Sequence, residues 1–198
     1  MIKCVIGLEI PDSGTIEIMS QKLEHLSLKA LDEIRADIGF LFQGSALYDS
    51  MTVRENLEFP LRRHISKFGN VKDTLPLVEE ALQNVGLKNV IDLMPNELSG
   101  GMKRRVALAR TLIIKTKIII YDEPTTGLDP ITSKEIILLM KSVQEKYKTS
   151  SIIITHDVDC ARVIANRMIL LIDGKNYAEG TFAELSTSQD PKVKAFFK

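Results

Sequence analysis

The sequence has no excess of either charge, because 26 lysines and arginines balance 26 aspartates and glutamates. A strongly basic surface that would attract nucleic acid or an anionic membrane is therefore not expected. Cysteine is scarce: Cys4 and Cys160 form neither a CxxC pair nor a zinc-binding spacing, so we interpret them as reduced thiols. No apolar run reaches the roughly 18 residues that a membrane-spanning helix requires. We expect any association with a membrane to go through a partner protein.

The motifs are densest in one stretch, which begins with Leu-Ser-Gly-Gly-Met at residues 98–102. Ser99 followed by Gly100 and Gly101 favours the start of a helix whose free backbone N–H groups can face an anion. Apolar residues then recur at the spacing of one helix face: Met102, Val106, Ala109 and Ile113. Basic residues of the same helix are expected on its solvated face: Lys103, Arg104 and Arg105.

Three strand patterns end in polar side chains. Four apolar residues precede Asp122 and Glu123, and a run of isoleucines ends two residues before His156. Both runs are typical of strands buried in a parallel sheet. A third pattern alternates from Ile38 and ends at Gln43. Ligands bind beyond the carboxyl ends of strands in open α/β sheets, so these three tips are candidate sites.

Local signals punctuate the rest of the chain. Residues 1–10 are expected to be the end of a helix. Capping patterns mark the other expected helix starts: Thr52 with Glu55, Pro76, Asp129 with Pro130, Thr181 with Glu184, and Asp190 with Pro191. Gly86 is expected to end the helix that Pro76 begins. The pair Asp173-Gly174 predicts a tight hairpin after a strand.

The order of the central motifs resembles the nucleotide-binding subunit of an ABC transporter. LSGG is followed by an apolar strand ending in Asp122-Glu123 and then by Gly-Leu-Asp at 127–129. Further features resemble the ATPase subunits of the lipid-trafficking, Mla-type branch, which work with an Mce-domain partner: residues 42–64, Met102 directly after LSGG, and residues 178–197. The resemblance covers nearly the whole chain.

This resemblance implies an α/β fold of the P-loop NTPase type, RecA-like, with a mostly parallel sheet flanked by helices and an inserted helical subdomain. It implies one domain over residues 1–198. The core would comprise residues 1–47 and 116–198, and the helical subdomain, on which a transmembrane permease docks, would comprise residues 48–115.

The resemblance also implies a role for each polar strand tip. Glu123 would polarise the water that attacks ATP, and His156 would contact the γ-phosphate. Asp122 would hold Mg²⁺, and Gln43 would reach both the metal and the water. Phosphoryl transfer needs such groups because phosphate charge must be neutralised and the water oriented. Each residue taken singly also fits an ordinary polar strand end, and the surrounding motifs favour catalysis.

Partners follow from the same resemblance. Two ATPase domains would meet head-to-tail as a homodimer. Ser99, Gly100 and Gly101 would then bind the γ-phosphate of a nucleotide on the other subunit, and Asp129 would cross the same interface. We therefore expect an ATP hydrolase that uses ATP and Mg²⁺. It would be cytoplasmic, held on the inner face of the cell membrane by its permease, with no nucleic-acid partner.

One motif of the family is missing. The loop GxxxxGK[ST], the Walker A motif, does not occur in the 198 residues, and residues 1–14 resemble the segment that normally follows it. We therefore expect the first strands and the P-loop to lie upstream of Met1, as in a fragment or after a misassigned start codon. The P-loop supplies amide groups and a lysine to the phosphates. Without it, this chain is expected not to bind MgATP in its own site.

Two other functions stay open at this point. The chain could be a non-catalytic interaction subunit that lends Ser99 and Asp129 to a P-loop on an intact partner. It could also be a soluble ABC ATPase of DNA repair or translation, although such proteins usually carry tandem domains, long insertions or basic extensions.

Overall fold

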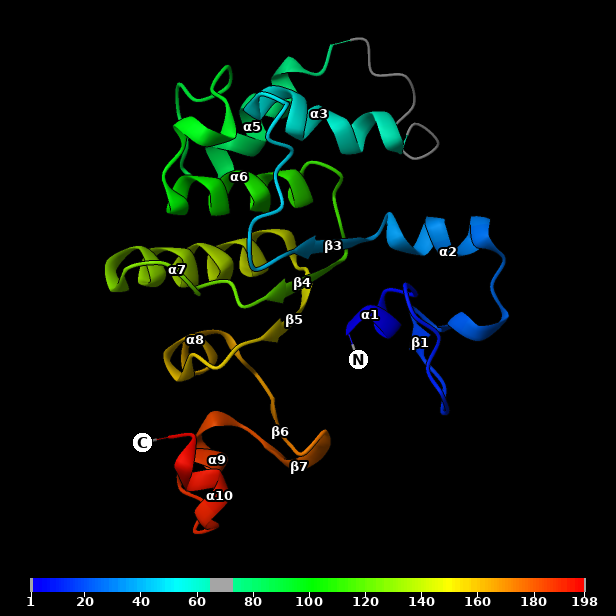
Figure 1. The fold of residues 1–198 in the computed structure, drawn as a ribbon, viewed down its shortest axis with the longest axis vertical. Coiled ribbons are helices and arrows are strands. Elements are labelled where there is room, and N and C mark those ends of the chain that lie inside the picture. The colour runs from blue at the N-terminus through cyan, green and yellow to red at the C-terminus, as the bar shows by residue number, and fades with distance from the viewer. Residues whose placement is uncertain (1, 65–72, 198) are drawn as a thin grey trace.

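The computed structural model describes residues 2–64 and 73–197. A parallel three-stranded sheet in the order β3-β4-β5 lies at its centre (Figure 1). The strands are Ile38–Leu41, Ile118–Asp122 and Ser150–Ile154. Ile119 and Ile120 of the middle strand β4 are fully buried, as expected where both faces of a parallel sheet are covered. Because the strands are parallel, their carboxyl ends meet at one edge.

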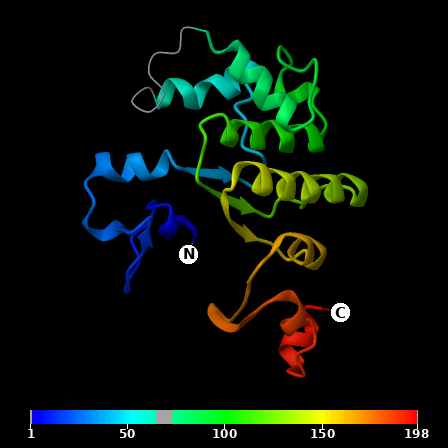
Figure 2. The same cartoon turned by 180° about the vertical axis from the view of Figure 1, so that it is seen from behind.

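Helix α6, Gly100–Leu112, is the most enclosed of the described helices. It packs against helices α3 (Val53–Arg63), α5 (Leu75–Asn84) and α7 (Pro130–Tyr147), and against strand β3. Both ribbon views place α6 between the α3–α5 layer and α7 (Figures 1 and 2). One apolar cluster continues through all of these helices. A short 3₁₀ turn, η2 at Pro95–Glu97, leads into α6.

The N-terminal elements are short: α1 (Ile2–Val5), β1 (Glu17–Ile18), β2 (Gln21–Lys22), η1 (Leu23–His25) and α2 (Leu28–Arg35). The Arg35 guanidinium donates hydrogen bonds to the carbonyls of Ile6 at 3.0 Å and Gly7 at 2.7 Å, which joins α2 to the turn after α1. The helix expected over residues 1–10 is shorter than predicted. It ends at Val5 because the chain turns at Gly7, whose φ is +68°.

The C-terminal part follows β5 as α8 (Val158–Ile164), the hairpin strands β6 (Met168–Ile172) and β7 (Lys175–Gly180), α9 (Phe182–Ser186) and α10 (Pro191–Ala195). Asp173 and Gly174 have φ of +50° and +73°, as the predicted two-residue hairpin requires. The rings of Phe182 and Phe197 meet edge to face, with centroids 5.4 Å apart. This contact attaches the end of the described chain to α9.

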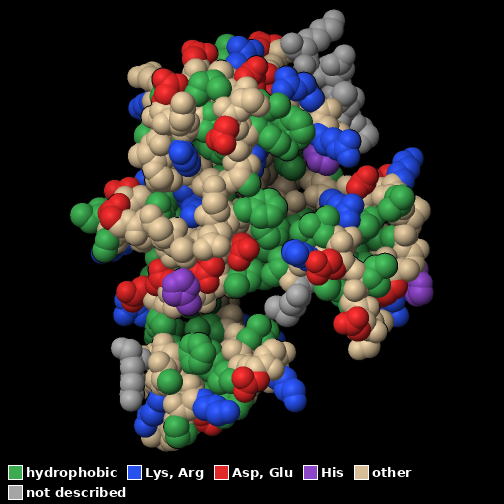
Figure 3. Space-filling model, in the orientation of Figure 1, with side chains coloured by type: hydrophobic (Ala, Val, Ile, Leu, Met, Phe, Trp, Pro, Cys, Tyr) green, Lys and Arg blue, Asp and Glu red, His purple; other side chains and the backbone are tan. Residues whose placement is uncertain are grey.

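Strand β5 is less buried than the sequence predicted. Its residues are exposed or half-buried, and 41% of Ile152 is exposed. In the part of the chain that the structure describes, β5 pairs only with β4, and β6 pairs with β7 in a separate sheet. Side chains of a parallel strand are buried only where both faces of the sheet are covered, and the exposure pattern of β5 shows that this cover is incomplete there. The space-filling view shows apolar side chains at the surface around the central strands (Figure 3).

The predicted helix starts are confirmed. Complete capping boxes begin α3 and α9, and aspartates that each accept two backbone N–H groups begin α7 and α10. Gly86, with φ of +71°, follows the end of α5 as expected. Among the described residues, no helix combines the length and the apolar character that crossing a membrane needs.

Candidate functional site

Glu123 has an unusual backbone conformation. It directly follows Asp122, the last residue of β4, with φ of +47°. Holding a residue other than glycine in this left-handed region costs about 1–3 kcal/mol. The N–H of Glu123 donates to the carbonyl of Ile154 at 2.9 Å, which ties the turn to β5. The Thr126 hydroxyl donates to the Glu123 carboxylate at 3.1 Å. The surrounding loop therefore holds both the backbone and the side chain of Glu123.

His156 contacts the same carboxylate. Its Nδ1 lies 2.9 Å from Oε2 of Glu123, with 77% of the histidine side chain and 21% of the glutamate side chain exposed. The hydrogen bond with Glu123, reinforced by the glutamate charge, raises the pKa of His156 above its usual value. The neighbouring Thr125 hydroxyl donates to the Asp157 carboxylate at 2.9 Å. Two side-chain contacts therefore join the tips of β4 and β5.

Gln43 reaches the same edge of the sheet from β3. The residue two positions before it, Leu41, pairs in register with Tyr121, which stands two positions before Glu123. Strand β3 ends at Leu41, so Gln43 lies in the turn that follows it, at the same carboxyl edge as Glu123. The Gln43 side chain is exposed, and within the described residues it is not hydrogen-bonded to Glu123 or His156. The structure brings these three predicted residues to one edge and joins only two of them directly.

The glycine-rich start of α6 forms the second part of the site. The Ser99 hydroxyl accepts a backbone N–H of the first turn at 3.2 Å, so Ser99 is the predicted N-cap, and Gly100 and Gly101 begin the helix. Asp129 caps α7 in the same way. A methyl group added to Gly100 would lie 3.4 Å from the side chain of Leu128. The starts of α6 and α7 are therefore neighbours.

Arg104 does not lie on the solvated face of α6, so that prediction is wrong. Only 4% of Arg104 is exposed. Its guanidinium donates to the carbonyls of Phe42 at 2.7 Å and Thr126 at 3.3 Å. One carbonyl directly precedes Gln43 and the other follows Glu123, so Arg104 connects the two loops. Burial lowers the pKa of the guanidinium.

A signal for this burial exists in the sequence. Residues one helical turn away on the same side of α6 are Gly101, Ala107 and Leu108, which are small or apolar, and all three are buried. A helix face whose neighbouring positions are small or apolar is expected to pack against the core. The adjacent Arg105 is half-buried as well and donates to the carbonyl of Val85 at 2.9 Å. Arg104 and Arg105 therefore bond to backbone carbonyls instead of lying fully in solvent.

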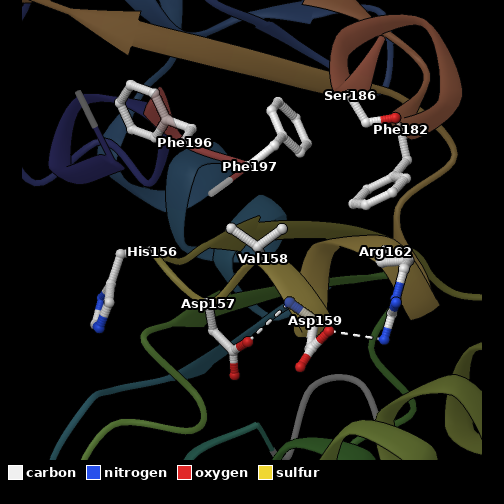
Figure 4. Close-up of a pocket in the computed structure, with 9 residues that line it drawn as sticks. All are labelled: His156, Asp157, Val158, Asp159, Arg162, Phe182, Ser186, Phe196 and Phe197. Carbon is white, nitrogen blue, oxygen red and sulfur yellow. Dashed lines mark hydrogen bonds and ion pairs between the residues drawn. The ribbon is translucent and has the colours of Figure 1, made fainter. Parts of the chain in front are cut away.

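A cavity of about 580 Å³ opens beside His156, between α8 and the C-terminal helices (Figure 4). Phenylalanine side chains form much of its wall: Phe182, Phe196 and Phe197. Asp159 and Arg162 on α8 pair with each other at 2.7 Å. The described residues contain no group of three or more histidine, cysteine, aspartate and glutamate side chains that could hold a metal ion.

Helices flanking a parallel sheet, with acidic residues and a histidine at its carboxyl edge, place the chain in the class of open α/β proteins that bind ligands beyond their strand ends. The family is more specific. Residues 1–126 match the family model described as ABC transporter, and the chain belongs to that family. The predicted family and the predicted α/β fold are both confirmed.

Similar proteins include several transport ATPases. The chain is 38% identical over 198 residues to the intermembrane phospholipid transport system ATP-binding protein MlaF of Haemophilus influenzae, covering all of this chain and 74% of that protein. It is 33% identical over 210 residues to the methionine import ATP-binding protein MetN of Campylobacter jejuni, covering 99% of this chain. The chain spans 62% of MetN, less than two thirds of its length.

Solved structures agree on the fold. A dimeric ATP-binding cassette in a post-hydrolysis state, bound to ADP and Pi, matches with a TM-score of 0.80 and 34% identity, covering 92% of this chain and 79% of that one. The protein cbiO1 of Clostridium perfringens, part of the ABC transporter complex cbiONQ, matches with a TM-score of 0.80 and 28% identity. That match covers 93% of this chain and 72% of cbiO1.

Replacing Arg104 with methionine should lower the free energy of unfolding by about 1–3 kcal/mol, because the backbone carbonyls of Phe42 and Thr126 lose a charged donor. Lys103→Met on the same helix is the matched control and should change stability by less than about 0.5 kcal/mol. Urea unfolding measures both. Equal stability of the two variants would contradict the connecting role of Arg104.

The His156 imidazole should titrate above pH 6.5 in NMR spectra, because Glu123 stabilises its charged form. A raised pKa means that this contact stabilises the fold fully below the unfolded-state pKa and is lost as pH rises through the folded-state pKa. Glu123→Gln should lower the titration midpoint, whereas Glu9→Gln, in the turn after α1, should not. An unchanged midpoint in Glu123→Gln would show that the contact is absent in solution.

Proposed function

We propose that the chain is the ATP-binding and ATP-hydrolysing subunit of an ABC transporter. It couples hydrolysis to a membrane permease and has no nucleic-acid partner. The observation that carries this proposal is the 2.9 Å contact between His156 and Glu123 at the carboxyl edge of the sheet. Glu123 is held at the end of the strand that supplies Asp122, and His156 comes from the neighbouring strand. A base positioned against a reacting water contributes about 10²–10⁴ in rate.

In this proposal Glu123 orients and polarises the attacking water, and His156 holds the terminal phosphate and keeps Glu123 in place. Gln43 lies at the same edge and would help to hold the metal and the attacking water. Asp122 and Gln43 would hold Mg²⁺ together with water and phosphate oxygens. This donor set fits, because Mg²⁺ needs only one or two protein carboxylates beside substrate phosphates. When bound, the metal neutralises the charge that develops on the phosphates.

Ser99, Gly100 and Gly101 act on a nucleotide held by a second ATPase subunit, and Asp129 lies at the same head-to-tail interface. The capped start of α6 supports this role, since its free N–H groups favour an anion. A solved cassette of the same fold, described as dimeric and bound to ADP and Pi, is consistent with such a pairing.

The protein works as one domain, with a core at 1–47 and 116–198 and a permease-docking helical part at 48–115.

The transported substrate is a phospholipid in this proposal. Similarity to MlaF over all 198 residues, together with Met102 directly after LSGG, favours the lipid-trafficking Mla branch. An Mce-domain protein would then deliver or receive the lipid. The subunit would sit at the cytoplasmic face of the membrane, held by its permease. Similarity to MetN makes methionine import the competing assignment.

A second function is favoured by one observation. The Ser99 cap of α6 is complete, so the signature start of this helix is formed as a partner's nucleotide site would require. The chain would then act as an interaction subunit that donates Ser99 and Asp129 to the nucleotide site of a partner. Measured by itself, the 198-residue chain should show no submillimolar affinity for MgATP, because the phosphates would meet carboxylates without a P-loop to offset them.

A hybrid in which a segment carrying GxxxxGK[ST] from an ABC ATPase precedes this chain should hydrolyse ATP. Glu123→Gln should then lower kcat by about 10²–10⁴, because the water loses its base. Glu145→Gln, on the exposed surface of α7, is the matched control and should leave the rate unchanged. Equal rates in both variants would refute catalysis by Glu123. Activation by a reconstituted permease rather than by DNA or RNA would separate transport from the soluble alternative.

The donated signature can be tested in a mixture. The partner is a homologue that carries a P-loop but whose own signature serine is replaced by arginine, so it is silent alone. Adding the 198-residue chain should restore ATPase activity, and Ser99→Arg should abolish the restoration. Ser13→Arg, in an exposed turn, controls for added charge. Activity that survives Ser99→Arg would exclude donation of this motif.

A further inference from the structure

Gly101 lies against a side chain of another helix. A methyl group built on Gly101 would lie 2.6 Å from Cγ2 of Thr132, a separation that real contacts essentially never show. On Gly100 the corresponding methyl group would meet Leu128 at 3.4 Å, an ordinary contact. Gly101 belongs to α6 and Thr132 to α7. The missing side chain at Gly101 therefore allows the starts of the two helices to approach.

Thr132 makes a different contact with each of its two γ-substituents. Its methyl group is seated on Gly101, and its hydroxyl donates to Oδ2 of Asp129 at 2.5 Å. Its backbone N–H donates to Oδ1 of the same carboxylate at 3.0 Å. A β-branched side chain has few rotamers, so the two contacts are fixed relative to each other. The hydrogen bond from Thr132 is the first cause that lowers the pKa of Asp129.

We propose that Thr132 is a positioning residue that sets where Asp129 stands relative to the LSGG start of α6. Its methyl group packs against Gly101 and so sets the separation of the two helix starts. Its hydroxyl donates to the Asp129 carboxylate and holds it in place. Gly101 accordingly serves helix-to-helix approach within the chain, besides any contact with nucleotide. The inference rests on the proposed function only in assigning Asp129 and LSGG to a shared interface.

The first test compares two glycine-to-alanine variants that should change stability in opposite directions. Glycine-to-alanine changes in helices ordinarily stabilise, because alanine has the higher helix propensity. Gly101→Ala should instead lower the ratio of folded to unfolded chain by about 5- to 30-fold, because its methyl group overlaps that of Thr132. Gly100→Ala is the matched control and should leave this ratio unchanged or raise it. Urea unfolding of the 198-residue chain measures all variants without nucleotide.

Rescue separates positioning from general damage to the helix. Thr132→Ser removes Cγ2 and keeps the hydroxyl, so the double variant Gly101→Ala with Thr132→Ser should recover most of the lost stability. Thr132→Val keeps the methyl group and removes the hydroxyl, so it should not rescue Gly101→Ala. No recovery in the serine double variant, or equal recovery with valine, overturns the proposal.

The contact between the Thr132 hydroxyl and the Asp129 carboxylate is tested by measuring the pKa of Asp129 by NMR. Asp129 should titrate below 3.8 in the unaltered chain and in Thr132→Ser, and its midpoint should rise in Thr132→Val. An unchanged midpoint in Thr132→Val would also overturn the inference. These measurements need no ATP, so they stand even where the mixed ATPase assay fails. Failure of that assay alone would reject the proposed function and leave the role of Thr132 intact.

Discussion

The buried guanidinium of Arg104 is the constraint on which the arrangement of the site depends. A charge removed from water must recover its hydrogen bonds inside the protein. Arg104 recovers two of them, from the backbone carbonyls of Phe42 and Thr126, while its Nε has no hydrogen-bond partner among the described residues. Both loops must therefore keep particular paths for α6 to stay enclosed. The loop that carries Gln43 and the loop that follows Glu123 are thus fixed by the helix that presents the glycine pair.

The strained backbone of Glu123 fits this arrangement. A residue in the left-handed region keeps this conformation only where several independent contacts hold it there. At Glu123 they do so through the carbonyl of Ile154, the hydroxyl of Thr126 and the imidazole of His156. Thr126 contacts both Arg104 and Glu123, because its carbonyl accepts a hydrogen bond from Arg104 and its hydroxyl donates one to the Glu123 carboxylate. The enclosed helix and the strained carboxylate are therefore coupled through one short loop.

Much of this fold is predictable because its signals are local. The caps at Ser99 and Asp129 bond within three residues of the chain, so short spacing is enough to predict them. The gathering of Gln43, Glu123 and His156 at one edge follows from three parallel strands with polar tips. The direct contact between Glu123 and His156 does not follow, because it depends on the turn that gives Glu123 its positive φ.

The sequence by itself determined the family, the caps, the strand tips and the hairpin at 173–174, all of which depend on neighbours in the chain or on an ordered set of motifs. Only the tertiary structure decided that Arg104 is enclosed, that Ile152 stays partly exposed and that Gly101 faces Thr132. The physical reason is that burial depends on what packs from distant parts of the chain. A periodic pattern identifies a face of a helix or strand but not what will cover it.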